Sequence, residues 1–198
     1  MAIEEIDLYK LKAEDLVKYL PGQDKGWAEF AQKLIDKNAK AVDCPKIEKK
    51  MAEAIDAVLS IDIRLPESDP MQQKVPEKLF EYNSPDDSSP VLITGNSIIT
   101  HQILKLILDK TKVKAYLVPV DTIGYTFDNS VVAGALTPMA VMKAINESGV
   151  GSKTSARKAI ISSLASEQKS GIERITRWAL ELGPVSGFEL PLYLIARG

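Results

Sequence analysis

The chain has 198 residues, of which 45% are apolar and 26% charged, and its formal net charge is −2. This charge gives no electrostatic basis for binding nucleic acid, and no apolar run is long enough to cross a bilayer. A single cysteine excludes an internal disulfide and suits a reducing compartment, and the N-terminus lacks the pattern of a secretory signal. We therefore expect a cytoplasmic protein that contacts neither nucleic acid nor membrane.

The first part of the chain is predicted to be helical. In residues 47–59 the apolar positions recur at spacings of four and three, which is typical of an amphipathic helix. Residues 63–89 are rich in proline and include an Asp-Asp-Ser-Ser run, a composition typical of a linker. We expect a helical domain at 1–62, a linker at 63–89 and a second domain at 90–198.

In the second domain, short apolar runs alternate with helical patterns. Strands are predicted at 91–94, 114–120, 158–162 and 179–182, and helices at about 97–110, 126–135, 138–148, 170–178 and 188–196. Thr137-Pro138 marks a helix start, and Ser170–Glu173 has the pattern of a capping box. The alternation predicts an α/β fold with a parallel, Rossmann-like sheet.

Two polar turns follow the first two predicted strands, at 94–97 and 122–125. In a parallel sheet both turns lie at the carboxyl edge, where open α/β sheets bind ligands. The turn Thr94-Gly95-Asn96 could hold an anion at a helix N-terminus. The phosphate-loop and dinucleotide glycine patterns are both absent, which disfavours a nucleotide-binding Rossmann module.

The sequence offers few residues for metal binding or hydrolysis. With one histidine, His101, and one cysteine, Cys44, no histidine–cysteine metal site and no catalytic triad can be assembled. His101 is either a half-exposed surface or packing residue or an axial metal ligand. Asp86 and Asp87 are interpreted as solvated loop acids.

Four ordered segments of the second domain resemble one family. They are PVLITGNSIIT at 90–100, VDTIG at 120–124 with VAGA at 132–135, ARKAII at 156–161, and the stretch from Gly171 through Trp178 to Leu194. Together they resemble the corrinoid-binding domain in the large (gamma) subunit of the corrinoid iron–sulfur protein, which belongs to the acetyl-CoA synthase/decarbonylase system. The mercury-methylating corrinoid protein shares this domain. Where the family has a glycine before its tryptophan, this chain has Arg177.

The N-terminal region resembles the four-iron four-sulfur domain of the same family. Cys44-Pro45 aligns with its last cluster cysteine, while Tyr19, Gly22 and Trp27 stand at the other three ligand positions. One thiolate cannot hold a cluster that needs four ligands, so we expect no iron–sulfur cluster. Cys44 is expected to be a small buried side chain, with Tyr19 and Trp27 filling the cluster space. The TIM barrel that the family carries between the two domains is absent here.

The resemblance implies a corrinoid (cobalamin) held base-off, and a methyl-corrinoid carrier in one-carbon metabolism rather than a complete enzyme. Its partner would be a methyltransferase or a second corrinoid-protein subunit. Asn129 would lie beneath the cobalt. The implied cofactor-binding residues are Thr94, Gly95, Asn96, Ser97, Thr100, Asp121, Thr122, Gly124, Tyr125, Thr126, Asn129, Ala133 and Gly134. The alternative is a cofactor-free paralogue that acts as an interaction or assembly protein.

Overall fold

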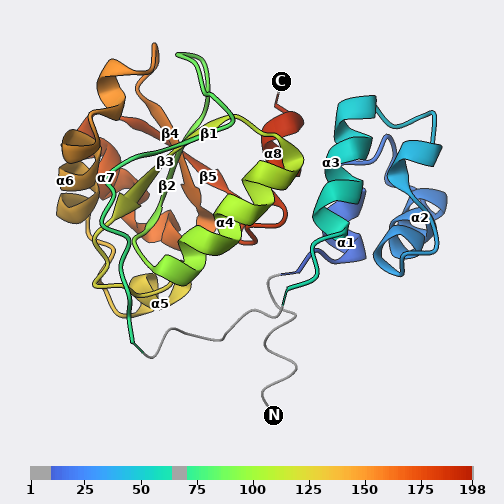
Figure 1. Cartoon of the computed structure of the whole chain (residues 1–198), viewed down its shortest axis with the longest axis horizontal. Coiled ribbons are helices and arrows are strands. Elements are labelled where there is room, and N and C mark those ends of the chain that lie inside the picture. The colour runs from blue at the N-terminus through green and yellow to red at the C-terminus, as the bar shows by residue number, and fades with distance from the viewer. Residues whose placement is uncertain (1–9, 64–70, 198) are drawn as a thin grey trace. The chain divides into compact units, whose positions relative to one another are not determined.

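The computed structural model describes residues 10–63 and 71–197, which fall into two compact units (Figure 1). One unit is formed by Met1–Leu65 with Ser186–Gly198, and the other by Pro66–Val185. The prediction assigned 90–198 to one domain, whereas this division groups the last residues with the helical unit. The part of the predicted linker at 64–70 lies outside the described residues.

The helical unit combines segments from both ends of the chain. Its elements are α1 (Ala13–Val17), α2 (Lys25–Ile35), the 3-10 turn η2 (Ala41–Asp43), α3 (Lys49–Leu59) and α8 (Leu190–Ile195). The carboxylate of Asp24 caps α2 by accepting from the N–H groups of Gly26 and Trp27, at 2.8 and 3.2 Å. Helix α8 packs against α3, and Tyr19 Oη donates to Glu189 Oε1 at 2.8 Å. The last turns of the chain therefore complete the core of this unit.

The second unit is a five-stranded sheet with helices. Its elements in chain order are β1 (Phe80–Tyr82), β2 (Val91–Gly95), α4 (Ile98–Thr111), β3 (Ala115–Val120), α5 (Phe127–Val132), α6 (Pro138–Ser148), η3 (Val150–Ser152), β4 (Lys158–Ser162), η4 (Ser163–Gln168), α7 (Lys169–Thr176) and β5 (Ala179–Gly183). The strand order is β1-β3-β2-β4-β5, with β1 antiparallel and the other neighbours parallel. The predicted parallel α/β fold is confirmed.

The sheet changes winding direction at β2. The chain passes from β2 through α4 to β3 on one side, and then returns across the sheet to β4 on the other side of β2. Figure 1 shows α4 and α6 on opposite faces of the sheet. The topological switch point therefore lies between the carboxyl ends of β2 and β4, beside the turn that follows β2, and folds of this type bind ligands at that point.

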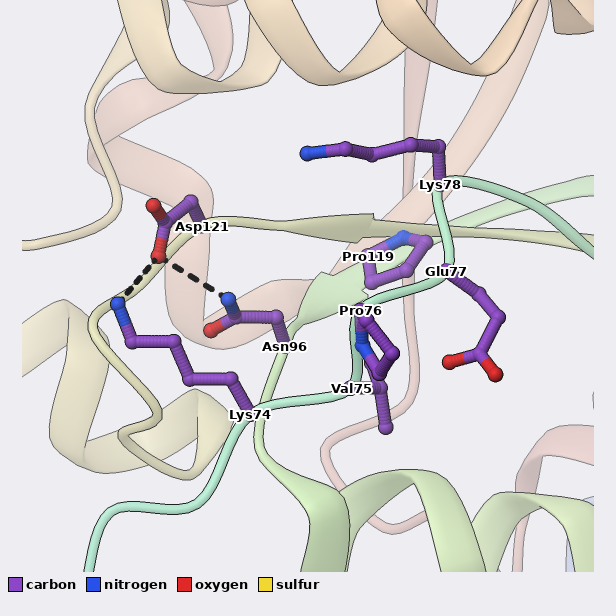
Figure 2. Close-up of a pocket in the computed structure, with 8 residues that line it drawn as sticks. All are labelled: Lys74, Val75, Pro76, Glu77, Lys78, Asn96, Pro119 and Asp121. Atoms are coloured by element: carbon purple, nitrogen blue, oxygen red, sulfur yellow. Dashed lines mark hydrogen bonds and ion pairs between the residues drawn. The ribbon is translucent and has the colours of Figure 1, made fainter.

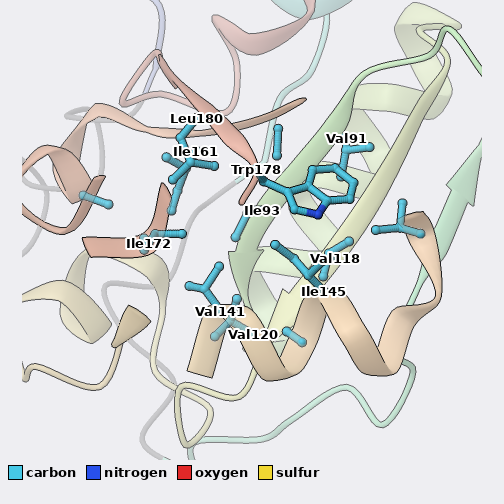
Figure 3. Close-up of a cluster of buried hydrophobic side chains, with 14 of the residues drawn as sticks. Val91, Ile93, Val118, Val120, Val141, Ile145, Ile161, Ile172, Trp178 and Leu180 are labelled. Carbon is cyan, nitrogen blue, oxygen red and sulfur yellow. The ribbon is translucent and has the colours of Figure 1, made fainter. Parts of the chain in front are cut away.

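The core explains why the strands could be recognised. Every residue of β2 and β3 is buried, as expected for parallel strands covered on both faces. Figure 3 shows the apolar cluster in which Trp178 lies with residues of β2, β3 and α6. Pro119 is tolerated in β3 because β1 pairs only as far as Leu117, so this stretch of β3 is paired on the β2 side alone.

Two local predictions are corrected or extended. The predicted capping box at Ser170–Glu173 is wrong, because α7 already begins at Lys169. The Glu173 carboxylate instead accepts from Leu180 N–H at 2.8 Å, and this hydrogen bond connects α7 to β5. Strand β1 was not predicted and lies within the proposed linker. The predicted cap of α6 is confirmed, since Thr137 Oγ1 accepts from Ala140 N–H at 3.1 Å.

Candidate functional site

The turns after β2 and β3 meet at the side chain of Asn96. Its Oδ1 accepts from the backbone N–H groups of Thr122 and Gly124, both at 3.1 Å, and its Nδ2 donates to Asp121 Oδ1 at 3.0 Å. Asn96 is only 7% exposed. A buried amide that satisfies two backbone donors fixes the second turn to the end of β2.

Thr122 also bonds back to Asn96, this time with its side chain as the acceptor. The backbone N–H of Asn96 donates to Thr122 Oγ1 at 3.3 Å, and this hydroxyl lies 3.2 Å from the carbonyl oxygen of Tyr125. A Cβ on Gly95 would lie 2.7 Å from the same hydroxyl, so the close approach of the turns requires glycine there. The N–H groups of Thr122, Ile123, Gly124 and Tyr125 are all bonded within the protein.

The second turn also holds unusual backbone geometry. Ile123 has φ +62° and Gly124 has φ +84°. A β-branched residue in the left-handed region is strained, and such strain is often found at functional sites. Ile123 is 56% exposed, so its side chain contributes little packing that would offset this strain.

Asp121 carries the negative charge of the site. Partial burial raises the pKa of its carboxyl group, but hydrogen bonds from the Ile123 N–H, Lys74 and Asn96 outweigh this and leave the pKa below its ordinary value. Lys74 Nζ lies 3.2 Å from Asp121 Oδ1. Figure 2 shows Lys74 and Asn96 reaching the same carboxylate from two different segments. Asp121 is therefore ionised at neutral pH.

A segment that the sequence did not single out lies across this edge. Residues 72–78, which we call the strap, precede β1. Val75 N–H donates to the Asn96 carbonyl, and Ile98 N–H donates to the Gln73 carbonyl, both at 2.9 Å. The Gln72 carbonyl packs against Gly124 so closely that a Cβ on Gly124 would overlap it. A hollow of about 320 Å³ lies beside the strap.

Helix α5 follows the second turn and packs against β2 and η4. The Oγ1 atom of Thr126, its N-cap residue, is buried and has no hydrogen-bond partner within the described chain. The half-buried side chain of Asn129 forms no hydrogen bond to other described residues. Beyond the helix, Ala133 is exposed, and a Cβ on Gly134 would meet no atom within 4 Å. This end of α5 is open, in contrast to the closed turns.

The remaining predicted residues surround the first turn. Thr94 is buried at the end of β2, and Thr100 is half-buried in the first turn of α4. Ser97 is fully buried, and its Oγ has no partner within the described residues. The structure thus brings Gly95, Asn96, Asp121, Thr122 and Gly124 together, while the α5 residues form a separate face. The contacts of Gln72, Gln73 and Lys74 were missed, because no periodic pattern marks them.

His101 lies in the first turn of α4 and packs against β1. It is only 9% exposed, with its ring centroid 3.7 Å from that of Phe80. Tyr82 Oη lies 3.3 Å from its Nε2. Burial lowers the pKa of the imidazole below its ordinary value. Of the two predicted roles, packing is observed, although the side chain is buried rather than half-exposed. Asp86 bonds to Ser88 and Lys114 in its loop.

The positions that align with cluster ligands are packed by side chains. The Trp27 ring lies against Gly22, where a Cβ would overlap it, and Tyr19 is bonded to Glu189. Cys44 is half-buried rather than buried. Across residues 10–63 and 71–197, no group of three or more His, Cys, Asp or Glu side chains could hold a metal ion. In the same ranges no helix is long and apolar enough to cross a membrane.

Comparison with known proteins identifies the family. A family model described as CO dehydrogenase/acetyl-CoA synthase delta subunit matches residues 33–193. The chain belongs to this family. The match includes α3, the strap, both turns and α5, so the candidate site lies wholly within the family's own sequence pattern.

Curated relatives carry related names. The acetyl-CoA decarbonylase/synthase complex subunit gamma of Methanopyrus kandleri is 32% identical over 66% of this chain and 29% of its own length. The same subunit of Methanothermobacter thermautotrophicus is 33% identical over 62% of this chain and 27% of its own length. The corrinoid/iron-sulfur protein large subunit of Moorella thermoacetica is 26% identical over 56% of this chain and 25% of its own length. The chain spans less than a third of the length of these relatives.

Proposed function

We propose that the chain binds a corrinoid and carries a methyl group in one-carbon metabolism for a partner methyltransferase or a second corrinoid-protein subunit. Support comes from the family and from relatives named as corrinoid/iron-sulfur protein and as acetyl-CoA decarbonylase/synthase subunits. The observation that favours it most is the open face of α5 at the carboxyl edge, where Asn129 presents an amide without a hydrogen-bond partner among the described residues.

The residues present suit a corrinoid on the α5 side of the site. A large neutral macrocycle edged with amides needs space, an apolar floor and a few polar groups. The α5 face offers space at Gly134, a buried hydroxyl without a partner at Thr126, and the 89% exposed side chain of Val132. The donors of the turns are already used, so Asn96, Thr122 and Gly124 would shape the site rather than bond to the ligand.

The protein's own contribution would be binding, orientation and exclusion of water. A bound corrinoid supplies the cobalt on which methyl groups are exchanged. Asn129 would offer the bound corrinoid a neutral amide oxygen, which is a weak ligand for cobalt and suits base-off binding. Thr126 would donate its hydroxyl proton to an acceptor on the ligand. Electrons for reducing the metal would come from a partner, because Cys44 alone cannot hold a cluster.

The alternative, a cofactor-free interaction or assembly protein, also has a specific observation in its favour. The N–H groups of the second turn are bonded within the protein, and the strap covers the first turn. A family member that had lost its ligand would be expected to close its edge in this way.

A substitution at the centre of the α5 face tests the proposal. Purified protein is mixed with hydroxocobalamin, free cofactor is removed by gel filtration, and retained cobalamin is measured. Asn129→Trp should abolish retention because the bulky ring occupies the face. Asn146→Trp, on the exposed side of α6, is the matched control and should retain as much as the parent chain. Equal retention by Asn129→Trp would refute the placement.

A further inference from the structure

The strap occupies the part of the sheet edge where a ligand would otherwise bind. It pairs with the first turn through an antiparallel bridge between Lys74 and Ser97. Its Gln73 carbonyl accepts the N–H of Ile98, the first residue of α4. The first N–H groups of a helix have no partner within the helix and commonly bind ligand acceptors. In this chain the strap supplies the acceptor itself.

Apart from two backbone hydrogen bonds and the buried side chain of Val75, the strap is held by weak contacts. The ion pair between Lys74 and Asp121 joins side chains that are 44% and 64% exposed, and exposed pairs stabilise little. Gln72 adopts φ +47°, a left-handed conformation that costs energy in any residue except glycine. The hollow of about 320 Å³ lined by Lys74, Pro76, Asn96 and Pro119 (Figure 2) leaves part of the strap without packed atoms beneath it.

The turns under the strap do not depend on it. Asn96 Oδ1 holds the N–H groups of Thr122 and Gly124, and Asn96 Nδ2 holds Asp121. These bonds connect the two turns directly and involve no strap atom. If the strap left, the edge would keep its shape while Ile98 N–H, the Asn96 carbonyl and the face of Gly124 became accessible.

We propose that the strap is a detachable cover of the carboxyl edge, which opens as a unit while the Asn96-linked turns stay closed. In the open state the edge offers a helix N-terminal donor, a carbonyl acceptor and a glycine face. This combination suits a neutral ligand group such as a carboxamide. The cover would therefore control access to this edge, whichever ligand the α5 face binds.

Amide hydrogen exchange followed by NMR tests this without any ligand. Val75 and Ile98 donate their amides across the strap contact, so their protection factors should be equal and lower than those of Thr122 and Gly124. Val118, which is fully buried in β3 and paired with β2, reports global unfolding. The double variant Lys74→Ala/Val75→Ala should accelerate exchange at position 75 and at Ile98 by about tenfold or more. The exchange rates of the Thr122, Gly124 and Val118 amides should be unchanged.

Lys105→Ala is the matched control. It removes an ion pair of similar exposure on α4, between Lys105 and Asp109, and should leave all five amides unchanged. Exchange at Val75 and Ile98 only at the rate of Val118 would overturn the proposal, because the strap would then open only by global unfolding. Opening of Thr122 and Gly124 together with the strap, or acceleration of Val118 by the same factor in the double variant, would overturn it equally.

Discussion

Asn96 and Thr122 bond to each other in both directions. Asn96 Oδ1 accepts from the Thr122 N–H at 3.1 Å, and Thr122 Oγ1 accepts from the Asn96 N–H at 3.3 Å. Each residue lies in the turn after a different strand, so this pair makes two separate βα turns into one rigid edge. The closed turns and the contacts that the strap makes with them depend on this edge.

Replacing Asn96 should destabilise the sheet unit. Asn96→Ala leaves the buried N–H groups of Thr122 and Gly124 without an acceptor, and we expect a loss of about 3 kcal/mol in the free energy of unfolding. Urea denaturation followed by circular dichroism measures it. Asn146→Ala removes an exposed amide from α6 and should change stability by less than about 0.5 kcal/mol. Similar losses for both variants would contradict the role given to Asn96.

Adding a methyl group at Gly124 should displace the strap. A Cβ there would overlap the Gln72 carbonyl, so Gly124→Ala should increase amide exchange at Val75 and Ile98. Gly134→Ala is a control for backbone strain, because Gly134 also has a positive φ, +67°, but its Cβ would meet no atom within 4 Å. If Gly134→Ala accelerated the same two amides equally, strain rather than overlap would be the cause.

The single histidine should make the stability of the sheet unit pH-dependent. Burial lowers the pKa of His101 in the folded state, so the unfolded chain binds the proton more tightly. Stability is therefore full above the unfolded pKa of about 6.5 and falls as the pH decreases through the folded pKa. The NMR titration of the imidazole should give a pKa below 6.5. His101→Phe should remove this pH dependence, and an equal decline in stability between pH 7 and 5 would contradict the assignment.

The C-terminal helix should stabilise the helical unit through Tyr19. Its hydroxyl donates to Glu189, and burial together with that carboxylate raises the pKa of Tyr19. Tyr19→Phe leaves the largely buried Glu189 with fewer donors and should cost about 1–2 kcal/mol in thermal or urea unfolding. Tyr193→Phe, whose hydroxyl contacts the exposed Arg197, should cost less. The opposite order would contradict the importance of the Tyr19 contact.

Most of the sheet unit could be predicted because its signals are local. Strands β2 and β3 are short apolar runs that end at glycine or aspartate, and α6 carries its own cap at Thr137. Strand β1 could not be predicted, because three residues in a proline-rich stretch become a strand only by pairing with β3. The capping-box pattern at Ser170 was misleading because Glu173 bonds to a residue of the next strand instead.

The site could be predicted in part. The sequence places polar and glycine residues after two adjacent strands, and parallel topology then brings Asn96 and Thr122 together. It does not show that the side-chain oxygen of each residue accepts the backbone N–H of the other, since that depends on side-chain orientation. Nor does it show the strap, because the Gln73 carbonyl reaches Ile98 over a separation in sequence that leaves no local pattern.

The visible spectrum of retained cobalamin tests the central proposal most directly. Protein freed of excess hydroxocobalamin should keep about one cofactor per chain. It should show the spectrum of the base-off form, because the proposed site holds the tail away from the metal and offers only the weak ligand Asn129 in its place. A protein that emerges without cobalamin would contradict corrinoid binding and favour the cofactor-free alternative. Retention with the tail still coordinated would contradict the position assigned to Asn129.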